Sequence, residues 1–142
     1  QGSCRYGQAP GLMEAASRSL VRERAGLRCE YCHLPEKALD ITFHVEHIVA
    51  RQHGGGDDLS NLCLACDRCN FHKGPNLTSI DPDSGLTVSL FHPRQEEWAE
   101  HFEFREAEIA GLTATGRATV RLLNMNARHR VLLRARLPGD WN

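Results

Sequence analysis

Cysteines with metal-ligand spacing lie in the first half of the chain. One pair is Cys29 and Cys32, and a second group with the same spacing contains Cys63, Cys66 and Cys69. A Cys-x-x-Cys turn brings two sulfurs to one side of the backbone, and two such turns supply the four thiolates of a closed tetrahedral zinc site. The sequence therefore predicts one structural zinc ion.

The first pair is unambiguous, whereas the spacing allows either Cys63 with Cys66 or Cys66 with Cys69 as the second. We favour Cys66 and Cys69, because Cys63 lies in an apolar run that suits a small buried residue. Residues 33–65 would then form an inserted unit whose two ends are clamped by the metal. A redox role for the pairs is the alternative, but no thioredoxin-like βαβ pattern accompanies them.

Acidic, imidazole and amide residues lie within and just after this inserted unit. Glu46 and His47 are adjacent near the end of a strand expected at 41–49, which is rich in β-branched residues. Asn61 follows three glycines, which we expect to give the loop the slack to return to the site. Asn70 directly follows the last zinc cysteine, on a short helix that the zinc would hold against the strand. We therefore expect these four side chains to converge.

Four segments, CEYC, VEHIVAR, GGGDDLSNL and CDRCNFHKG, occur in this order and spacing. They resemble the zinc-clamped branch of the HNH endonuclease family over residues 29–74. The resemblance implies an α+β fold with a ββα-metal (His-Me finger) core and a metal-dependent DNA endonuclease that nicks or cuts duplexes, with RNA as a possible substrate. The later segments DPDSG, LFHPR, EEWAEHF and GRATVRLLNMN are similar, in pattern only, to the C-terminal extension of small stand-alone bacterial members.

The resemblance also implies roles for the four polar residues. His47 would be the general base that takes a proton from the attacking water, and Asn61 would orient it through the hairpin loop. Glu46 and Asn70 would hold one catalytic ion. Asn70 stands where the family usually has His, and its amide oxygen favours Mg²⁺ or Mn²⁺. The implied products carry a 5′ phosphate and a 3′ hydroxyl.

Two histidines are weaker candidates. His72 could replace Asn70 as a ligand, although side chains two residues apart on a helix point in different directions. His44 shares a strand face with Glu46 and is expected at the surface.

Charge is unevenly distributed although the net charge is −1. Residues 109–139 contain six Arg and no acidic residue. Arg suits phosphate oxygens, so this tail could hold a polyanion, and a solvated Arg-rich helix is the alternative. The candidate nucleic-acid contacts are Arg51, Lys73, Arg117 and Arg121. A zinc-clamped module that binds nucleic acid without cutting is the alternative function.

The length of 142 residues predicts one domain. We expect a nuclease core over 13–76, preceded by a disordered segment (1–12, with a tag-like start at 1–3 and an incidental Cys4) and followed by an extension over 77–142 packed on the core. No apolar run is long enough to cross a membrane. With no signal peptide and closely paired cysteines, we expect a cytoplasmic protein. The sequence leaves the oligomeric state open.

Local sequence patterns predict the flanking elements. These are helices at 13–27, 94–106, 117–124 and 126–136, and a strand at 87–91.

Overall fold

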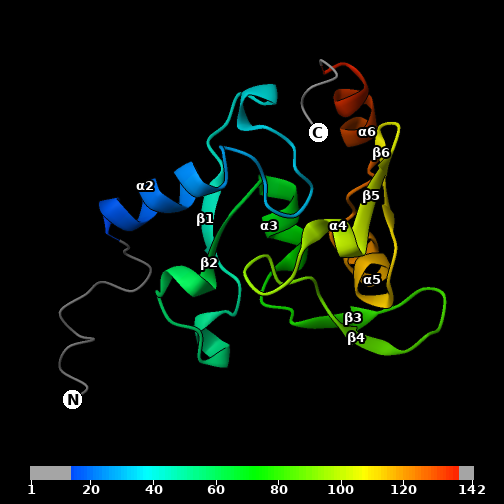
Figure 1. Cartoon of the computed structure of the whole chain (residues 1–142), viewed down its shortest axis with the longest axis horizontal. Helices are drawn as coiled ribbons and strands as arrows, with labels where there is room; N and C mark the ends of the chain where they lie inside the picture. The colour runs from blue at the N-terminus through cyan, green and yellow to red at the C-terminus, as the bar shows by residue number, and fades with distance from the viewer. Residues whose placement is uncertain (1–13, 138–142) are drawn as a thin grey trace.

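The computed structural model describes residues 14–137 (Figure 1). The expected segment 1–12 and Cys4 lie outside the described residues. The helices are α2 (Ala15–Arg24), α3 (Asp67–Lys73), α4 (Trp98–His101), α5 (Ala114–Leu122) and α6 (Arg128–Ala135). The strands are β1 (His44–His47), β2 (Leu62–Ala65), β3 (Thr78–Ile80), β4 (Thr87–Ser89), β5 (Phe102–Arg105) and β6 (Glu108–Gly111). Short 3₁₀ turns occur at Glu36–Ala38, Arg51–His53 and Leu59–Asn61.

A hairpin and one helix form the central unit. Strands β1 and β2 pair antiparallel, with Glu46 opposite Cys63. β2 is buried at every position, as its apolar sequence predicts. Helix α3 follows directly and lies against β1. The expected helix at 67–73 is confirmed, and so is the α+β fold class.

Helix α2 lies beside this hairpin on the left of Figure 1. Val21 is its fully buried residue. Arg22 donates two hydrogen bonds, at 3.0 and 2.9 Å, to the carboxylate of Glu36. Glu36 also accepts a hydrogen bond from the backbone of Phe43, just before β1, so this ion pair fixes α2 to the segment that enters the hairpin.

The helix expected at 94–106 is wrong, because only α4 is helical there and β5 follows it. The two Phe residues of β5 alternate with charged residues, which is the period of a half-buried strand. Phe102 is buried, and Phe104 pairs with Ile109 of β6. Glu106 adopts a positive φ of 57° in the turn between the strands, which a continuous helix does not allow.

Helices α5 and α6 lie close to the helices expected at 117–124 and 126–136. Thr113 caps α5 by accepting a hydrogen bond from the backbone N–H of Gly116 at 3.0 Å. A Cβ at Gly116 would lie 2.0 Å from the carbonyl oxygen of His101, so glycine is required where α5 packs on the end of α4. Asn124, with φ of 52°, separates α5 from α6 as predicted.

A single hydrophobic cluster connects the two halves of the described chain. The zinc cysteines lie in this cluster together with Phe91, Phe102, Ile109 and Met125 of the second half. Trp98 donates a hydrogen bond to the carbonyl of Tyr31 at 2.7 Å and so joins α4 to the first Cys-x-x-Cys turn. Among residues 14–137, no helix has the length and apolarity needed to span a membrane.

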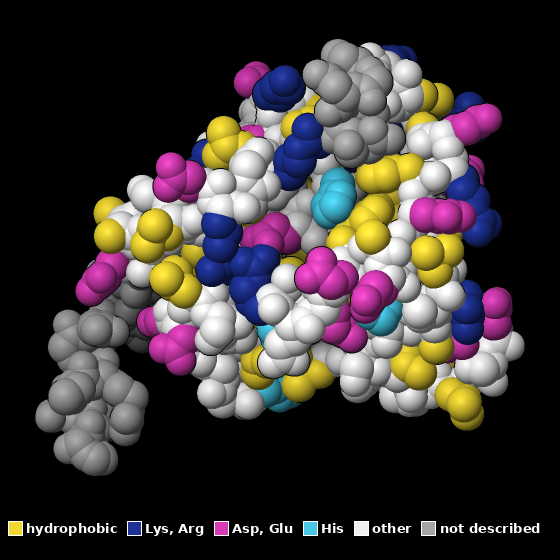
Figure 2. Space-filling view, in the orientation of Figure 1, with side chains coloured by type: hydrophobic (Ala, Val, Ile, Leu, Met, Phe, Trp, Pro, Cys, Tyr) yellow, Lys and Arg dark blue, Asp and Glu magenta, His cyan; other side chains and the backbone are white. Residues whose placement is uncertain are grey.

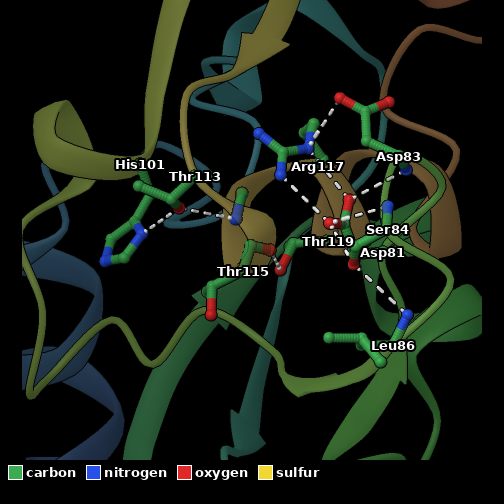
Figure 3. A network of polar contacts seen from close by, with 10 residues as sticks. Asp81, Asp83, Ser84, Leu86, His101, Thr113, Thr115, Arg117 and Thr119 are labelled. Carbon is green, nitrogen blue, oxygen red and sulfur yellow. Dashed lines mark hydrogen bonds and ion pairs between the residues drawn. The ribbon is translucent and has the colours of Figure 1, made fainter.

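A buried carboxylate joins the β3–β4 hairpin to α5 (Figure 3). Both oxygens of Asp81 accept hydrogen bonds from Arg117, from Nε at 2.9 Å and from Nη2 at 3.0 Å. Ser84 donates its hydroxyl to Asp81 at 2.7 Å, and Arg117 also lies 3.1 Å from the carboxylate of Asp83. The hydrogen bonds from Arg117 hold the pKa of Asp81 well below its ordinary value.

We expect Asp81→Asn to lower the Tm at neutral pH, because the amide cannot form the two-fold ion pair with Arg117. The folded-state pKa of Asp81 lies below its unfolded value of 3.8. The contribution of Asp81 to stability is therefore complete above that value and is lost as the pH falls through the folded-state pKa. Thermal unfolding from pH 7 to 2 should show the Tm difference shrinking in acid. Asp83→Asn, at the exposed neighbour, is the control, and an equal loss for both variants at pH 7 would contradict this role.

Candidate zinc clamp and catalytic pocket

Four sulfurs converge between the first Cys-x-x-Cys turn and the start of α3. The Sγ atoms of Cys29, Cys32, Cys66 and Cys69 all lie within 4.8 Å of one another, and all four residues are buried. The sulfurs of Cys32 and Cys66 are 3.8 Å apart. A tetrahedron with Zn–S bonds of about 2.3 Å has edges of about 3.8 Å. The geometry therefore fits a zinc ion, and the predicted choice of Cys66 and Cys69 is confirmed.

The protonation of these thiols also fits a cation. Burial, with the thiols of Cys32 and Cys66 close by, holds the pKa of Cys29 well above its ordinary value. The neighbouring thiols likewise raise the pKa of Cys69. The pKa of Cys66 lies well below its ordinary value, because the other three thiols hydrogen-bond to its sulfur. Without a metal one thiolate is favoured at the expense of the others, and all four sulfurs can ionise together only around a bound cation.

Cys63 lies outside the sulfur cluster. Its side chain is 1% exposed on β2, and its Sγ lies 3.7 Å from the hydroxyl of Tyr31. Burial raises the pKa of the Cys63 thiol to about 12. It is thus a small core residue, as the apolar run around it predicts.

Glu46, His47 and Asn70 line one pocket of about 340 Å³ between β1 and α3. Successive side chains of a strand point to opposite faces, so Glu46 and His47 can border the same pocket only where the strand ends. β1 ends at His47. Asn70 lies one turn of α3 beyond Cys66, and its backbone N–H donates to the Cys66 carbonyl at 2.9 Å. The zinc clamp thereby fixes the position of Asn70 relative to β1.

The Glu46 carboxylate is suited to a bound cation. Burial raises its pKa, against the lowering effects of His44, His47, Lys73 and the adjacent Asn70 amide. A carboxylate that is partly desolvated in this way is stabilised by a positive ligand. Together Glu46 and Asn70 offer a carboxylate and an amide oxygen, which are the hard ligands that Mg²⁺ or Mn²⁺ takes.

Asp57 contacts the imidazole of His47. Its Oδ1 lies 2.7 Å from Nε2 of His47 and accepts a hydrogen bond from Arg51 at 2.7 Å. The hydrogen bond with His47 and then the one from Arg51 lower the pKa of Asp57. An Nε2–H donated to a carboxylate leaves Nδ1 as the acceptor nitrogen of a neutral ring. The sequence analysis did not single out Asp57, because one of two acids in a polar loop has no distinguishing pattern.

Asn61 does not bind His47 directly but holds the backbone shortly after His47 and just before Asp57. Its Oδ1 accepts from the N–H of Val49 at 2.8 Å, and its Nδ2 donates to the carbonyls of Val49 at 3.0 Å and Gly56 at 2.9 Å. Val49 follows His47 by two residues, and Gly56 precedes Asp57. Any effect of Asn61 on His47 therefore passes through the hairpin loop.

The middle residue of the triple glycine, Gly55, is tightly packed. A Cβ on Gly55 would lie 1.7 Å from the carbonyl oxygen of Val49 and 2.8 Å from Nδ2 of Asn61. Gly54 adopts φ of 92°, which also favours glycine, whereas a Cβ on Gly56 would meet nothing within 4 Å. The expectation of a loose loop is corrected: Gly55 permits a close backbone contact that seats the loop.

Two of the expected cationic contacts border the pocket. Arg51 has a side chain that is 45% exposed. Lys73 is only 6% exposed, and its Nζ donates to the carbonyl of Ile48 at 2.8 Å. Lys73 thus ties α3 to the end of β1, whereas Arg51 remains accessible to a ligand.

The other two expected contacts lie on α5. Arg117 is engaged by Asp81 and Asp83, as Figure 3 shows. Arg121 is exposed, and within the described part of the chain it forms no ion pair. Basic and acidic side chains are intermixed on the face shown in Figure 2, with no continuous basic band there.

The remaining candidates on β1 and α3 do not line the pocket. Nε2 of His72 lies 3.2 Å from Arg68, and His72 does not line the pocket. His44 has a side chain that is 54% exposed and lies 3.9 Å from the Glu46 carboxylate. Phe71, which the sequence analysis also missed, is 79% exposed beside Asn70. An exposed aromatic ring in this place is available to stack on a base.

We expect the purified protein to contain about one zinc ion per chain and Cys29→Ser to lose both zinc and folded structure. Elemental analysis and circular dichroism measure the two quantities. Cys63→Ser is the matched control, because it also removes a buried thiol but lies outside the cluster, and it should keep the metal. A folded, zinc-free Cys29→Ser protein would disprove the clamp.

Gly55→Ala should lower the free energy of unfolding by about 1–3 kcal/mol, because the methyl group forces Val49 and Asn61 apart. Gly56→Ala should lower the free energy of unfolding much less, since open space surrounds that position. Urea unfolding followed by circular dichroism compares the two variants. Equal stabilities would mean that the loop does not depend on this contact.

Comparison with known families agrees with the geometry. The family model of HNH endonucleases matches residues 29–76, from the first zinc cysteine to just beyond α3. No curated protein and no solved structure gave a significant match to the chain. An HNH domain indicates a nuclease or nucleic-acid-binding function. Residues 29–76 therefore match the HNH endonuclease family, and their four cysteines, placed to bind a metal, are consistent with its zinc-clamped branch.

Proposed function

We propose that this protein is a metal-dependent endonuclease that hydrolyses phosphodiesters in DNA. The observation that carries the proposal is the shared pocket, in which a carboxylate, an imidazole and an amide from two different elements meet. A module that only binds nucleic acid would not need a partly buried Glu46 beside an imidazole held by a carboxylate. RNA has the same phosphate chemistry and is the second substrate to be tested.

Glu46 and Asn70 would hold the catalytic ion, Mg²⁺ or Mn²⁺. The two protein ligands leave positions for water and for phosphate oxygens, which is how Mg²⁺ is commonly bound. When bound, the ion would stabilise the charge that develops on the phosphate and on the leaving 3′ oxygen. Glu46 must be ionised to bind it, so its raised pKa makes binding weaken on acidification.

His47 would act as the general base. Asp57 would accept a hydrogen bond from Nε2–H, which leaves Nδ1 free to take a proton from the water that attacks phosphorus. Asp57 also stabilises the positive charge that His47 acquires. Asn61 keeps Asp57 in place through the carbonyl of Gly56. The roles of base, positioning carboxylate and loop support therefore fall on three separate residues.

Arg51 would hold a phosphate of the substrate. Its guanidinium is fixed at one nitrogen by Asp57, and its exposed side chain borders the pocket. A guanidinium offers several further donors to phosphate oxygens. A basic contact of this kind makes binding sensitive to salt. One pocket per chain would nick one strand, and paired subunits would cut both.

The wild-type protein should relax supercoiled plasmid with Mg²⁺ or Mn²⁺ and not with EDTA. His47→Ala should reduce the rate by about 10²–10⁴-fold, which is the usual contribution of a positioned base. Gel electrophoresis over time measures the conversion. Binding without cleavage in any metal would favour the non-cleaving alternative, and equal rates for wild type and His47→Ala would exclude His47 as the base.

Asp57→Asn tests the positioning role in the same assay. It should lower kcat with little change in KM, because the substrate still binds while the base loses its partner. Asp58→Asn is the matched control, since the adjacent acid is exposed. A loss confined to KM, or the same loss in both variants, would contradict the role given to Asp57.

A further inference from the structure

Two arginines of α6 are buried in the interior. Arg134 is 1% exposed and Arg130 is 4% exposed. Guanidinium groups remain charged in proteins, and burying a charge is costly unless an opposite charge lies close to it. The sequence places these residues in the basic tail that was expected to face a polyanion. Their burial raises the question of which negative charge balances them.

A carboxylate balances the charge of only one of the two arginines. Arg130 Nη2 donates to Asp67 at 2.7 Å, but its Nε and Nη1 have no hydrogen-bond partner. Arg134 donates to the carbonyls of Ala107 and Met125 and to the Asn126 side chain, all of them neutral. Its Nη1 has no partner. Within residues 14–137, Arg134 forms no ion pair.

The sulfur cluster is the candidate source of the missing negative charge. Burial lowers the pKa of Arg134, and the charges of Cys32 and Cys69 oppose that lowering. Burial also acts on Arg130, where Cys66 and Asp67 more than compensate and the pKa is raised. The geometry points the same way: Arg130 binds Asp67, which directly follows Cys66, and Arg134 binds the carbonyl of Met125, which lies in one buried cluster with the four cysteines. Four thiolates around one Zn²⁺ carry two uncompensated negative charges, which two guanidiniums match.

We propose that Arg130 and Arg134 are the counter-charges of the zinc-loaded cluster, so that α6 and the metal stabilise each other. Arg130 also pairs with Asp67, directly after the ligand Cys66, and Arg134 links α6 to the β5–β6 turn and to the end of α5. Through these two side chains the last helix becomes part of the zinc site. Loss of the ion would leave the two guanidiniums with less negative charge beside them, the Asp67 carboxylate and the one thiolate that the metal-free cluster favours, which would loosen α6.

The test measures zinc affinity and not nuclease activity. Zinc transfer from the loaded protein to a chromophoric chelator is followed for Arg130→Gln and Arg134→Gln. Arg128→Gln and Arg136→Gln are matched controls, because both side chains are exposed and flank the pair along the chain. Residues that support metal ligands from outside typically contribute about 10–100-fold in affinity, and we expect a loss in this range for the buried pair alone. Affinities equal to those of the controls would overturn the proposal.

A lysine variant of Arg134 separates the effect of charge from that of packing. It also tests the proposal if the Gln variants do not fold. Arg134→Lys keeps the positive charge but not the forked hydrogen bonds. If charge balance is the reason for these residues, Arg134→Lys should hold zinc markedly better than Arg134→Gln. It should also remain folded where the Gln variant does not. Equal loss of zinc or of folded structure in the two variants would show that Arg134 acts by packing alone and would overturn the proposal.

Discussion

The convergence of four sulfurs on one metal-binding position is the constraint on which the rest of the structure depends. It joins the turn at Cys29 and Cys32 to the start of α3, although residues 33–65 separate them in sequence. α3 is short, and Cys66 precedes it as the N-cap, with its sulfur accepting a hydrogen bond from the backbone N–H of Cys69. A helix of this length is not stable alone in water, so its position must come from the metal and the surrounding core.

The pocket is a consequence of this constraint. Because α3 is fixed against β1, Asn70 meets Glu46 and His47 where the strand ends. The loop between β1 and β2 then returns to the same place, seated by Gly55 against Val49 and bound by Asn61. In the proposed mechanism, metal ligation and proton transfer fall to β1 and α3, while the positioning carboxylate Asp57 is carried by a loop with several hydrogen bonds.

The sequence predicts those parts of the fold that have a local pattern. Cys-x-x-Cys spacing, the strand before His47 and the helix after Cys66 are of this kind. Asp57 and Asp58 are chemically identical neighbours, so only the folded loop shows which of them meets His47. The helix expected at 94–106 extends past α4 into β5, because β5 is short and its pairing with β6 appears only in the fold. The arginines at 109–139 suggest a nucleic-acid-binding surface in the sequence. Only long-range packing shows that Arg134 is buried inside the protein.

The claim that the pocket hydrolyses phosphodiesters is tested most directly by the ends that it leaves. Plasmid nicked by the protein in the presence of Mg²⁺ can be purified and treated with a DNA ligase. Departure of the 3′ oxygen leaves a 5′ phosphate and a 3′ hydroxyl, so the account predicts nicks that the ligase reseals to covalently closed circles. Nicks that cannot be resealed, or that arise equally with EDTA or with the His47→Ala protein, would contradict it.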